Sequence, residues 1–331
     1  MELLILFGSL AILLVIGLPV AFSLGMASLA TMVYLDIPLV VAFQRMASGM
    51  NIFALMAIPF FIYAGELMNQ SGIAVRLVRF AHSLLATVRG GLGLVNVASS
   101  MMFGAISGSA VASASAMGST LIPIMQKQGY DTDYAVNVTA TAATTGLLIP
   151  PSHNMIIYAI AAGGGVSIGS LFLAGIIPGI LLGIGLMIAA YLVAIKRGYP
   201  SGEFPGWQSV LRHFISALPG LFTVIIILGG ILSGVFTATE SSAIAVIYTV
   251  LVAVFVYRSL DWNGFVTASI NAVKTTAMIL VIIGTAASFG WLLAVVEVPA
   301  QLSSALLSIS DNPLVILLLV NIILLLLGTF M

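Results

Sequence analysis

The chain has 331 residues, of which 61% are hydrophobic and only 6% are charged, and ten Lys+Arg balance ten Asp+Glu. Soluble domains carry about 25% charged residues, so this composition excludes a water-soluble enzyme, a nucleic-acid binder and a disordered scaffold. The absence of cysteine excludes disulfides, thiolate metal sites and cysteine nucleophiles. We therefore expect an all-α polytopic membrane protein, with no catalytic residue and no nucleic-acid partner.

A spanning helix needs about 20 apolar residues, so the chain has room for roughly 10 membrane elements. A soluble linker is predicted from Lys196 through His213, and a break near Gly284 is predicted within a late apolar run. Apolar runs predict helices, in chain order, over 3–18, 20–35, 37–47, 52–68, 72–88 (amphipathic), 92–126 (interrupted), 134–163 (broken), 166–195, 214–233, 236–257, 265–291 and 313–331.

Lysine and arginine favour cytoplasmic loops, and this bias sets the orientation of a membrane protein. Most of the basic residues can share one side of the membrane only if the stretch 92–126 enters and leaves by the same face. We therefore predict that 92–126 is a re-entrant hairpin of two half-helices, and that the N-terminus lies outside, on the non-cytoplasmic side. The basic residues on the shared side are Arg76, Arg79, Arg89, Lys127, Lys196, Arg197, Arg212 and Arg258.

The second half of the chain repeats features of the first half in the same order, although chance similarity among apolar helices is the alternative. With the charge pattern, this order predicts an inverted repeat, which is the build of many secondary transporters. Because the first copy continues past its hairpin, we expect about 60–100 further residues after Met331. The segments around Gly17, Gly65 and Gly104 resemble those around Gly234, Gly290 and Gly328.

A run of small residues interrupts the stretch 92–126. Ser107, Gly108 and Ser109 lie together within it. Small residues allow helices to pack closely in lipid, which is one explanation of the run. The other explanation is a hairpin tip, where the backbone leaves the helix and serine hydroxyls can bind a ligand. Broken backbone at membrane depth is tolerated only where protein buries it or where it lines a cavity. The clustering of the two serines favours the tip.

Two consecutive prolines, Pro150 and Pro151, interrupt the run 134–163. Proline lacks a donor and disfavours helix in the preceding residue, so the helix must unwind from Gly146 to Pro151. The freed carbonyls, with nearby hydroxyls, suit a hard monovalent cation such as Na⁺. A kink satisfied by neighbouring Ser/Thr side chains is the alternative. The half-helix that starts near Ser152 directs its positive end toward the break, which suits an anion.

Several other polar residues have weaker claims. Ser107 with His153 could form an intramembrane hydrolase, but that requires a geometry that the sequence cannot show. Intramembrane acids are functional candidates by default. Glu66 could equally lie at the interface, whereas Glu240 is a candidate for a structural or gating role.

Five motifs together resemble one family. They read AIPFF at 57–61, AGELM at 64–68, SGSA at 107–110, LIPPS at 148–152 and FTATE at 236–240. In this order they resemble the large membrane subunit of tripartite ATP-independent periplasmic (TRAP) transporters, the DctM-like or M subunit. The resemblance runs from the first helix to Met331. The family continues with a second hairpin and a second Pro-containing break that this sequence lacks.

The resemblance implies a function and a set of partners. It implies an ion-transporter-superfamily-like elevator, in which two hairpins and two broken helices slide against a scaffold. The subunit would pair with a small four-helix membrane subunit in the bacterial inner membrane. It would receive its substrate from a periplasmic binding protein. Na⁺ would drive import of a small organic anion, such as a C4-dicarboxylate, sialic acid, or a sugar or keto acid.

The resemblance also implies roles for particular residues. Ser107, Gly108 and Ser109 would form the first hairpin tip and contact substrate, with Ser152 and Asn154 lining the substrate site. Gly328 and Thr329 would begin a second hairpin and a second Na⁺ site. The first Na⁺ site would be formed by Ser107, Ser109, Thr145, Gly146, Ile149 and Pro151.

The predicted division of the chain has six segments. Residues 1–51 are scaffold helices of the first repeat, and 52–91 hold a span and an amphipathic arm helix. The first part of the transport domain is 92–165, with the hairpin at 92–126 and the broken helix at 134–163. The remainder comprises a connecting span and cytoplasmic linker at 166–213, scaffold helices of the second repeat at 214–264, and a span, an arm and the start of the second hairpin at 265–331.

Two alternative functions stay open. The first is a Na⁺- or H⁺-coupled anion symporter or antiporter of similar build that works without a binding protein. The second, from a different class, is the intramembrane serine hydrolase.

Overall fold

In the computed structural model the described residues are 1–163, 165–310 and 312–330, and of Leu327, Thr329 and Phe330 only the backbone is described. The described part of the chain is helical and contains no strand. It divides into two compact units, one formed by Met1–Ile52 with the chain from Ala277 onward, and the other by Phe53–Thr276. The predicted functional division into scaffold and transport segments stays a prediction.

The first unit packs its helices around a small apolar core. Leu6, Ala27 and Leu292 are fully buried in that core. Each comes from a different helix, so two consecutive N-terminal helices meet there with a segment from the last part of the chain. The unit contains α1 (Glu2–Val15), α2 (Val20–Tyr34), α3 (Val40–Met50), the second part of α13 (Trp262–Val295), α14 (Val298–Ile309) and α15 (Pro313–Phe330).

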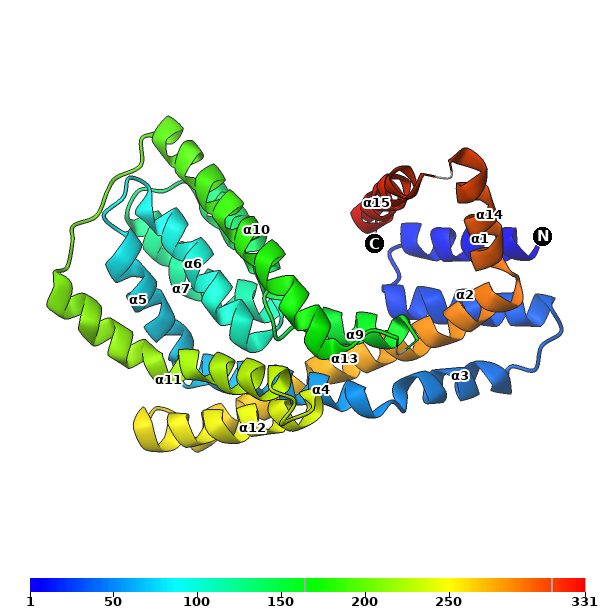
Figure 1. Ribbon diagram of the computed structural model, residues 1–331, viewed down its shortest axis with the longest axis horizontal. Helices are drawn as coiled ribbons and strands as arrows, with labels where there is room; N and C mark the ends of the chain where they lie inside the picture. Colours follow the sequence, from blue (N-terminus) through cyan, green and yellow to red (C-terminus); the bar gives the residue numbers. More distant parts are fainter. Residues whose placement is uncertain (164, 311, 331) are drawn as a thin grey trace. The chain divides into compact units, whose positions relative to one another are not determined.

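The second unit is arranged around α6, which contacts helices on several sides (Figure 1). Its elements are η1 (Phe53–Met56), α4 (Ala57–Gln70), α5 (Ile73–Leu85), α6 (Gly91–Ser107), α7 (Ala110–Lys127), α8 (Thr132–Ala143), η2 (Thr144–Leu147), α9 (His153–Ala161), α10 (Ile168–Arg197), α11 (Trp207–Leu232), α12 (Ala238–Leu251), the π-helical turn η3 (Val252–Val256) and the first part of α13.

The helix α5 is amphipathic, as the sequence predicts. Its residues at helical spacing, such as Leu77 and Ala81, are buried against the apolar faces of α6, α7 and α11. Arg79 lies on the opposite face and is exposed. Because this apolar face packs against both α6 and α7, α5 helps to hold that helix pair in place.

Four described helices are long and apolar enough to cross a membrane, namely α10, α11, α12 with η3, and α13. Several shorter helices, including α1, α2 and α6, are also apolar. These lengths fit a chain that crosses a bilayer several times. The prediction of a polytopic, all-helical protein agrees with this architecture, whereas the re-entrant and elevator features stay predictions.

Two element predictions are wrong. The linker predicted to extend through His213 ends earlier, because α11 begins at Trp207 and continues through Arg212 and His213. Charged residues mark where a span leaves the apolar layer, but a helix can continue beyond that layer. The break near Gly284 is absent, since α13 is continuous there. A Cβ at Gly284 would lie 3.1 Å from the Met50 sulfur, so this glycine allows close packing.

Candidate functional site

The helices α6 and α7 form a hairpin whose turn lies at Gly108. Gly108 has a φ of 61°, a left-handed conformation that glycine adopts without a steric penalty. Ser109 caps the following helix, where its hydroxyl accepts a hydrogen bond from the Ala112 N–H at 3.3 Å. The Ser113 hydroxyl donates to the Ser100 carbonyl at 3.4 Å, which joins the two antiparallel arms (Figure 1). The helix is therefore interrupted at Ser107, Gly108 and Ser109, as the sequence predicts.

A second break separates α8 from α9. The α-helix ends at Ala143, tightens into η2 and stops at Leu147, and α9 begins at His153. In a continuous helix the carbonyls of Gly146 and Leu147 would accept hydrogen bonds from residues 150 and 151, which are prolines without an N–H. The Leu147 carbonyl accepts instead from the Ser152 hydroxyl at 2.6 Å. The prediction that the helix unwinds at the two prolines is confirmed.

The hairpin and the break contact each other directly through their backbones. A Cβ built on Gly104 of α6 would lie only 2.5 Å from the Gly146 Cα. At the tip, a Cβ on Gly108 would lie 2.6 Å from the Pro151 carbonyl oxygen. The His153 N–H donates to the Gly108 carbonyl at 3.4 Å. Two non-helical segments, more than 35 residues apart in the sequence, thus form one site.

Glycines of neighbouring helices allow the protein to enclose this broken backbone. A Cβ on Gly65 of α4 would lie 2.9 Å from the Ser107 Cβ. From α10, a Cβ on Gly175 would lie 2.5 Å from the Leu148 carbonyl oxygen. Ser107, Thr145 and Ser152 are fully buried. Irregular backbone at membrane depth needs such surroundings, because unsatisfied peptide groups in lipid are costly.

The structure brings most of the predicted site residues together, with some exceptions. Asn154 lies in the first turn of α9 but its side chain is exposed, and Ser109 is half-buried. Gly328 lies within the continuous helix α15 with open space around it. The side chain of Thr329 lies outside the described residues. The residues that do meet at the tip and the break are Ser107, Gly108, Ser109, Thr145, Gly146, Ile149, Pro151 and Ser152.

His153 is a site residue to which the sequence reasoning gave little weight. The residue is only 4% exposed, its Nε2 has no hydrogen-bond partner among the described residues, and its ring centre lies 6.5 Å from that of Phe61. The sequence feature that could have identified His153 as a site residue is its position directly after Ser152, at the start of a half-helix. The Ser107 hydroxyl donates toward the Ser109 carbonyl, at 3.5 Å, rather than to the imidazole. The hydrogen bond that a serine–histidine pair requires is therefore not formed.

Acidic side chains do not build this site. Among the described residues, no group of three His, Cys, Asp or Glu side chains converges in a way that could hold a metal ion. Glu240 forms a capping box with Thr237, accepting from its N–H at 2.8 Å, and this contact stabilises the start of α12. Glu66 accepts a hydrogen bond from Asn271 at 3.4 Å. The oxygens offered at the tip and the break are carbonyls and hydroxyls, which suit a cation that does not require carboxylates.

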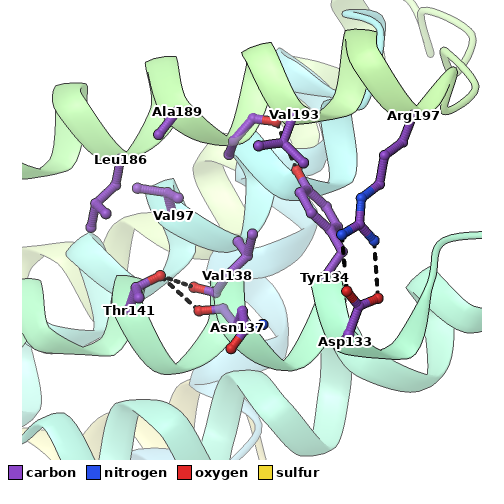
Figure 2. A pocket seen from close by; sticks show the side chains of 11 residues that line it. Val97, Asp133, Tyr134, Asn137, Val138, Thr141, Leu186, Ala189, Val193 and Arg197 are labelled. Carbon is purple, nitrogen blue, oxygen red and sulfur yellow. Dashed lines mark hydrogen bonds and ion pairs between the residues drawn. The ribbon is translucent and has the colours of Figure 1, made fainter.

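A separate groove of about 250 Å³ lies between α8 and α10 (Figure 2). Its walls are mostly apolar, and none of the predicted site residues lines it. At one end Arg197 forms ion pairs with Asp131 and Asp133, each at 2.9 Å. Two hydrogen bonds hold the pKa of Asp131 below its usual value. The one from Tyr199 has the larger effect, and the one from Arg197 the smaller. The Arg197 hydrogen bond does the same for the pKa of Asp133. This cluster ties the end of α10 to the start of α8, the helix that leads into the break.

Comparison with known proteins agrees with this architecture. Residues 7–331 match the family described as "Tripartite ATP-independent periplasmic transporter, DctM component". The chain is 41% identical over 330 residues to the uncharacterized protein YgiK of Salmonella typhimurium, covering 99% of this chain and 75% of the relative.

Two relatives with assigned functions are also similar. The sialic acid TRAP transporter large permease protein SiaM of Vibrio cholerae is 40% identical over 319 residues, covering 96% of this chain and 74% of the relative. The C4-dicarboxylate TRAP transporter large permease protein DctM of the same species is 36% identical over 340 residues, covering 96% and 75%. The chain therefore belongs to the DctM family of TRAP transporter large permease components.

Proposed function

We propose that this chain is the substrate-translocating subunit of a Na⁺-coupled importer of a small organic anion. The observation that carries the proposal is the meeting of the hairpin tip at Gly108 with the proline break at Pro151. Two segments of unwound backbone at one buried place provide both peptide oxygens and helix N-termini. Discontinuous helices of this kind hold ions and substrate in secondary transporters.

The first Na⁺ would bind among the oxygens of the break. The Gly146 carbonyl is a strong candidate ligand, because the residue that would donate to it in a helix is Pro150. The Thr145 hydroxyl donates to the Ala142 carbonyl at 2.7 Å, which leaves its oxygen lone pairs available. The other candidate ligands are Ser107, Ser109, Ile149 and Pro151.

The anionic substrate would bind where two helices begin. Ser109 precedes α7 and Ser152 precedes α9, so both N-termini start at this site. Helix N-termini stabilise negative charge through their free N–H groups and dipole. Gly108, Ser107 and Asn154 would add amide and hydroxyl contacts. The substrate's charge would thus be met by N–H and O–H groups.

Transport would follow an elevator mechanism in the bacterial inner membrane, with the N-terminus in the periplasm. A small four-helix subunit would complete the membrane part, and a periplasmic binding protein would deliver the substrate. The named relatives transport sialic acid or C4-dicarboxylates, and we propose an anion of this size and charge, including sugar and keto acids. Gly328 and Thr329 would begin the second hairpin and a second Na⁺ site.

The test is reconstituted uptake. The purified subunits are placed in liposomes, and uptake of candidate organic anions is measured with and without an inward Na⁺ gradient and the soluble binding protein. We expect uptake only when both are present. Uptake that persists without the binding protein would favour an independent symporter or antiporter. Uptake that is indifferent to both Na⁺ and the binding protein would refute the proposal.

A further inference from the structure

A polar pocket of about 280 Å³ lies away from the candidate transport site. It is formed by the end of α4, the start of α5 and the segment that follows η3. Its lining includes Gln70, Ser71, Arg76, Arg79 and Ser259. The Ser259 hydroxyl donates to the Ser71 carbonyl at 2.7 Å, which fixes the segment after η3 against the end of α4. The pocket is thus assembled by a tertiary contact.

The pocket is basic, and its charges are not paired. Among the described residues, neither Arg76 nor Arg79 forms an ion pair with a carboxylate. Nη1 of Arg76 donates to the Ser71 and Gly72 carbonyls at 3.2 and 3.0 Å, and its guanidinium lies 3.8 Å from the centre of the Tyr257 ring. These contacts hold the group in place while its Nε and Nη2 donors remain for a ligand. Arg79 is exposed and has no described hydrogen bond within the protein.

Other features of the pocket also favour a negative ligand. The 13-residue helix α5 begins at its edge, and no described side chain caps that N-terminus. The acidic residues that flank the lining segments in sequence, Glu66 and Asp261, do not line the pocket and accept hydrogen bonds elsewhere. Glu66 accepts from Asn271, and Asp261 accepts from the Gly264 N–H at 2.8 Å. An anion with several acceptor oxygens, such as a phosphate group, matches two guanidinium groups in this arrangement.

The surroundings place the pocket at the level of the membrane interface. It lies directly after the candidate span Ala238–Val256. In the last turn of that span, Phe255 is 69% and Val256 is 60% exposed, which is an apolar surface suited to acyl chains. Trp262, which is 75% exposed, follows a few residues later, and tryptophan is enriched at bilayer interfaces. The bias of basic residues assigns this side to the cytoplasmic leaflet, where anionic lipids gather.

We propose that this pocket binds the phosphate headgroup of an anionic phospholipid from the inner leaflet, with its acyl chains along the exposed end of α12 and η3. Arg79 and the free donors of Arg76 hold the phosphate. The bound lipid fixes the start of α5 to the membrane. The inference is independent of which ion or solute the protein transports.

Lipid binding to the purified protein tests this inference. The protein is placed in a neutral detergent, and phosphatidylglycerol bound per protein is titrated by native mass spectrometry, with phosphatidylcholine as the zwitterionic comparison. We expect Arg79→Gln to weaken phosphatidylglycerol binding by roughly fivefold, since a basic residue near an anionic membrane surface contributes about 1 kcal/mol. Arg76→Gln is expected to weaken it further.

The matched control is Arg89→Gln, which removes another exposed arginine outside the pocket and should leave binding within about twofold, well short of the roughly fivefold loss expected at the pocket. A circular dichroism spectrum shows whether each variant keeps its helices. Equal losses in Arg79→Gln and Arg89→Gln would indicate general charge attraction and overturn the inference. Equal affinity for phosphatidylcholine, or displacement of the lipid by millimolar inorganic phosphate, would also overturn it.

Discussion

The backbones of Gly104 and Gly146 lie against each other without side chains between them. A Cβ on Gly104 would approach the Gly146 Cα to 2.5 Å, and a Cβ on Gly146 would approach the Gly104 Cα to 3.0 Å. Gly104 lies in the last turn of the first hairpin arm, and Gly146 lies in η2 just before the proline break. This contact therefore sets the distance between the hairpin and the broken helix.

Replacing Gly104 by alanine tests that contact. Gly104→Ala should force α6 away from η2, because the clash is with backbone atoms that cannot rotate aside. We expect a loss of stability of about 1–3 kcal/mol, together with reduced uptake. Gly185→Ala in α10 is the matched control, since no atom of the described residues lies within 4 Å of its Cβ position. Thermal unfolding in detergent compares the two, and equal stability of both variants would contradict the contact.

The sequence predicts the positions of the two breaks because their causes are local. Pro150 and Pro151 cannot donate helical hydrogen bonds, and Gly108 permits the left-handed turn that ends α6. The contact between Gly104 and Gly146 could not be predicted, because it depends on how two distant segments pack. The wrong prediction of a break at Gly284 has the same cause. This glycine is needed for close packing against Met50, a contact with a distant segment that the sequence does not show.

The role of His153 shows a further limit of the sequence. The sequence shows that His153 follows Ser152. Its burial and its Nε2 without a partner among the described residues depend on the packing of the hairpin tip and of Phe61 against it, which the sequence does not show. The start of α11 at Trp207 could also not be predicted, because charged residues such as Arg212 and His213 are typical of a linker as well. A polar helical turn beyond a span has the same composition as a loop.

Ser107 should not react as a nucleophile. Its hydroxyl donates toward the Ser109 carbonyl, and in the described part of the chain no base forms a hydrogen bond with it. A serine nucleophile needs such a base at about 2.6–3.2 Å. We expect no adduct on Ser107 when the folded protein is treated with a fluorophosphonate and its peptides are analysed by mass spectrometry. An adduct that disappears in His153→Gln would revive the hydrolase.

The cluster around Arg197 should make stability depend on pH in the acidic range. In the folded protein the pKa of Asp131 is lowered by hydrogen bonds from Tyr199 and Arg197, and the pKa of Asp133 is lowered by the hydrogen bond from Arg197. A carboxyl whose folded pKa is depressed stabilises the protein above its unfolded pKa, and that contribution is lost as the pH falls through the folded value. The contribution should therefore be constant from neutral pH to about pH 5 and decline below the ordinary aspartate pKa of about 3.9.

Thermal unfolding of Arg197→Gln and of the unaltered protein measures this dependence. The difference in melting temperature should be small at pH 7, since exposed ion pairs contribute little, and it should shrink further as the aspartates are protonated. Lys196→Gln is the control, because Lys196 forms no ion pair among the described residues. A difference in melting temperature that grows at low pH would contradict the expectation that protonation of Asp131 and Asp133 removes their stabilising effect.

The Na⁺ concentration that gives half-maximal uptake tests the central claim most directly. Ser107→Ala and Pro151→Ala each change one side of the meeting point between tip and break. Ser107→Ala removes a hydroxyl ligand, and because hydrogen-bonding a charged group contributes about 1.5–3 kcal/mol, this variant should raise that concentration roughly tenfold or more. Pro151→Ala keeps the backbone carbonyl but restores an N–H that can donate to the Leu147 carbonyl, so the helix can extend across the break and the concentration should rise as well. Ser119→Ala, whose hydroxyl donates to the Ala116 carbonyl within α7, should leave it unchanged. Half-maximal Na⁺ concentrations that are the same in all three variants and in the unaltered protein would contradict the site.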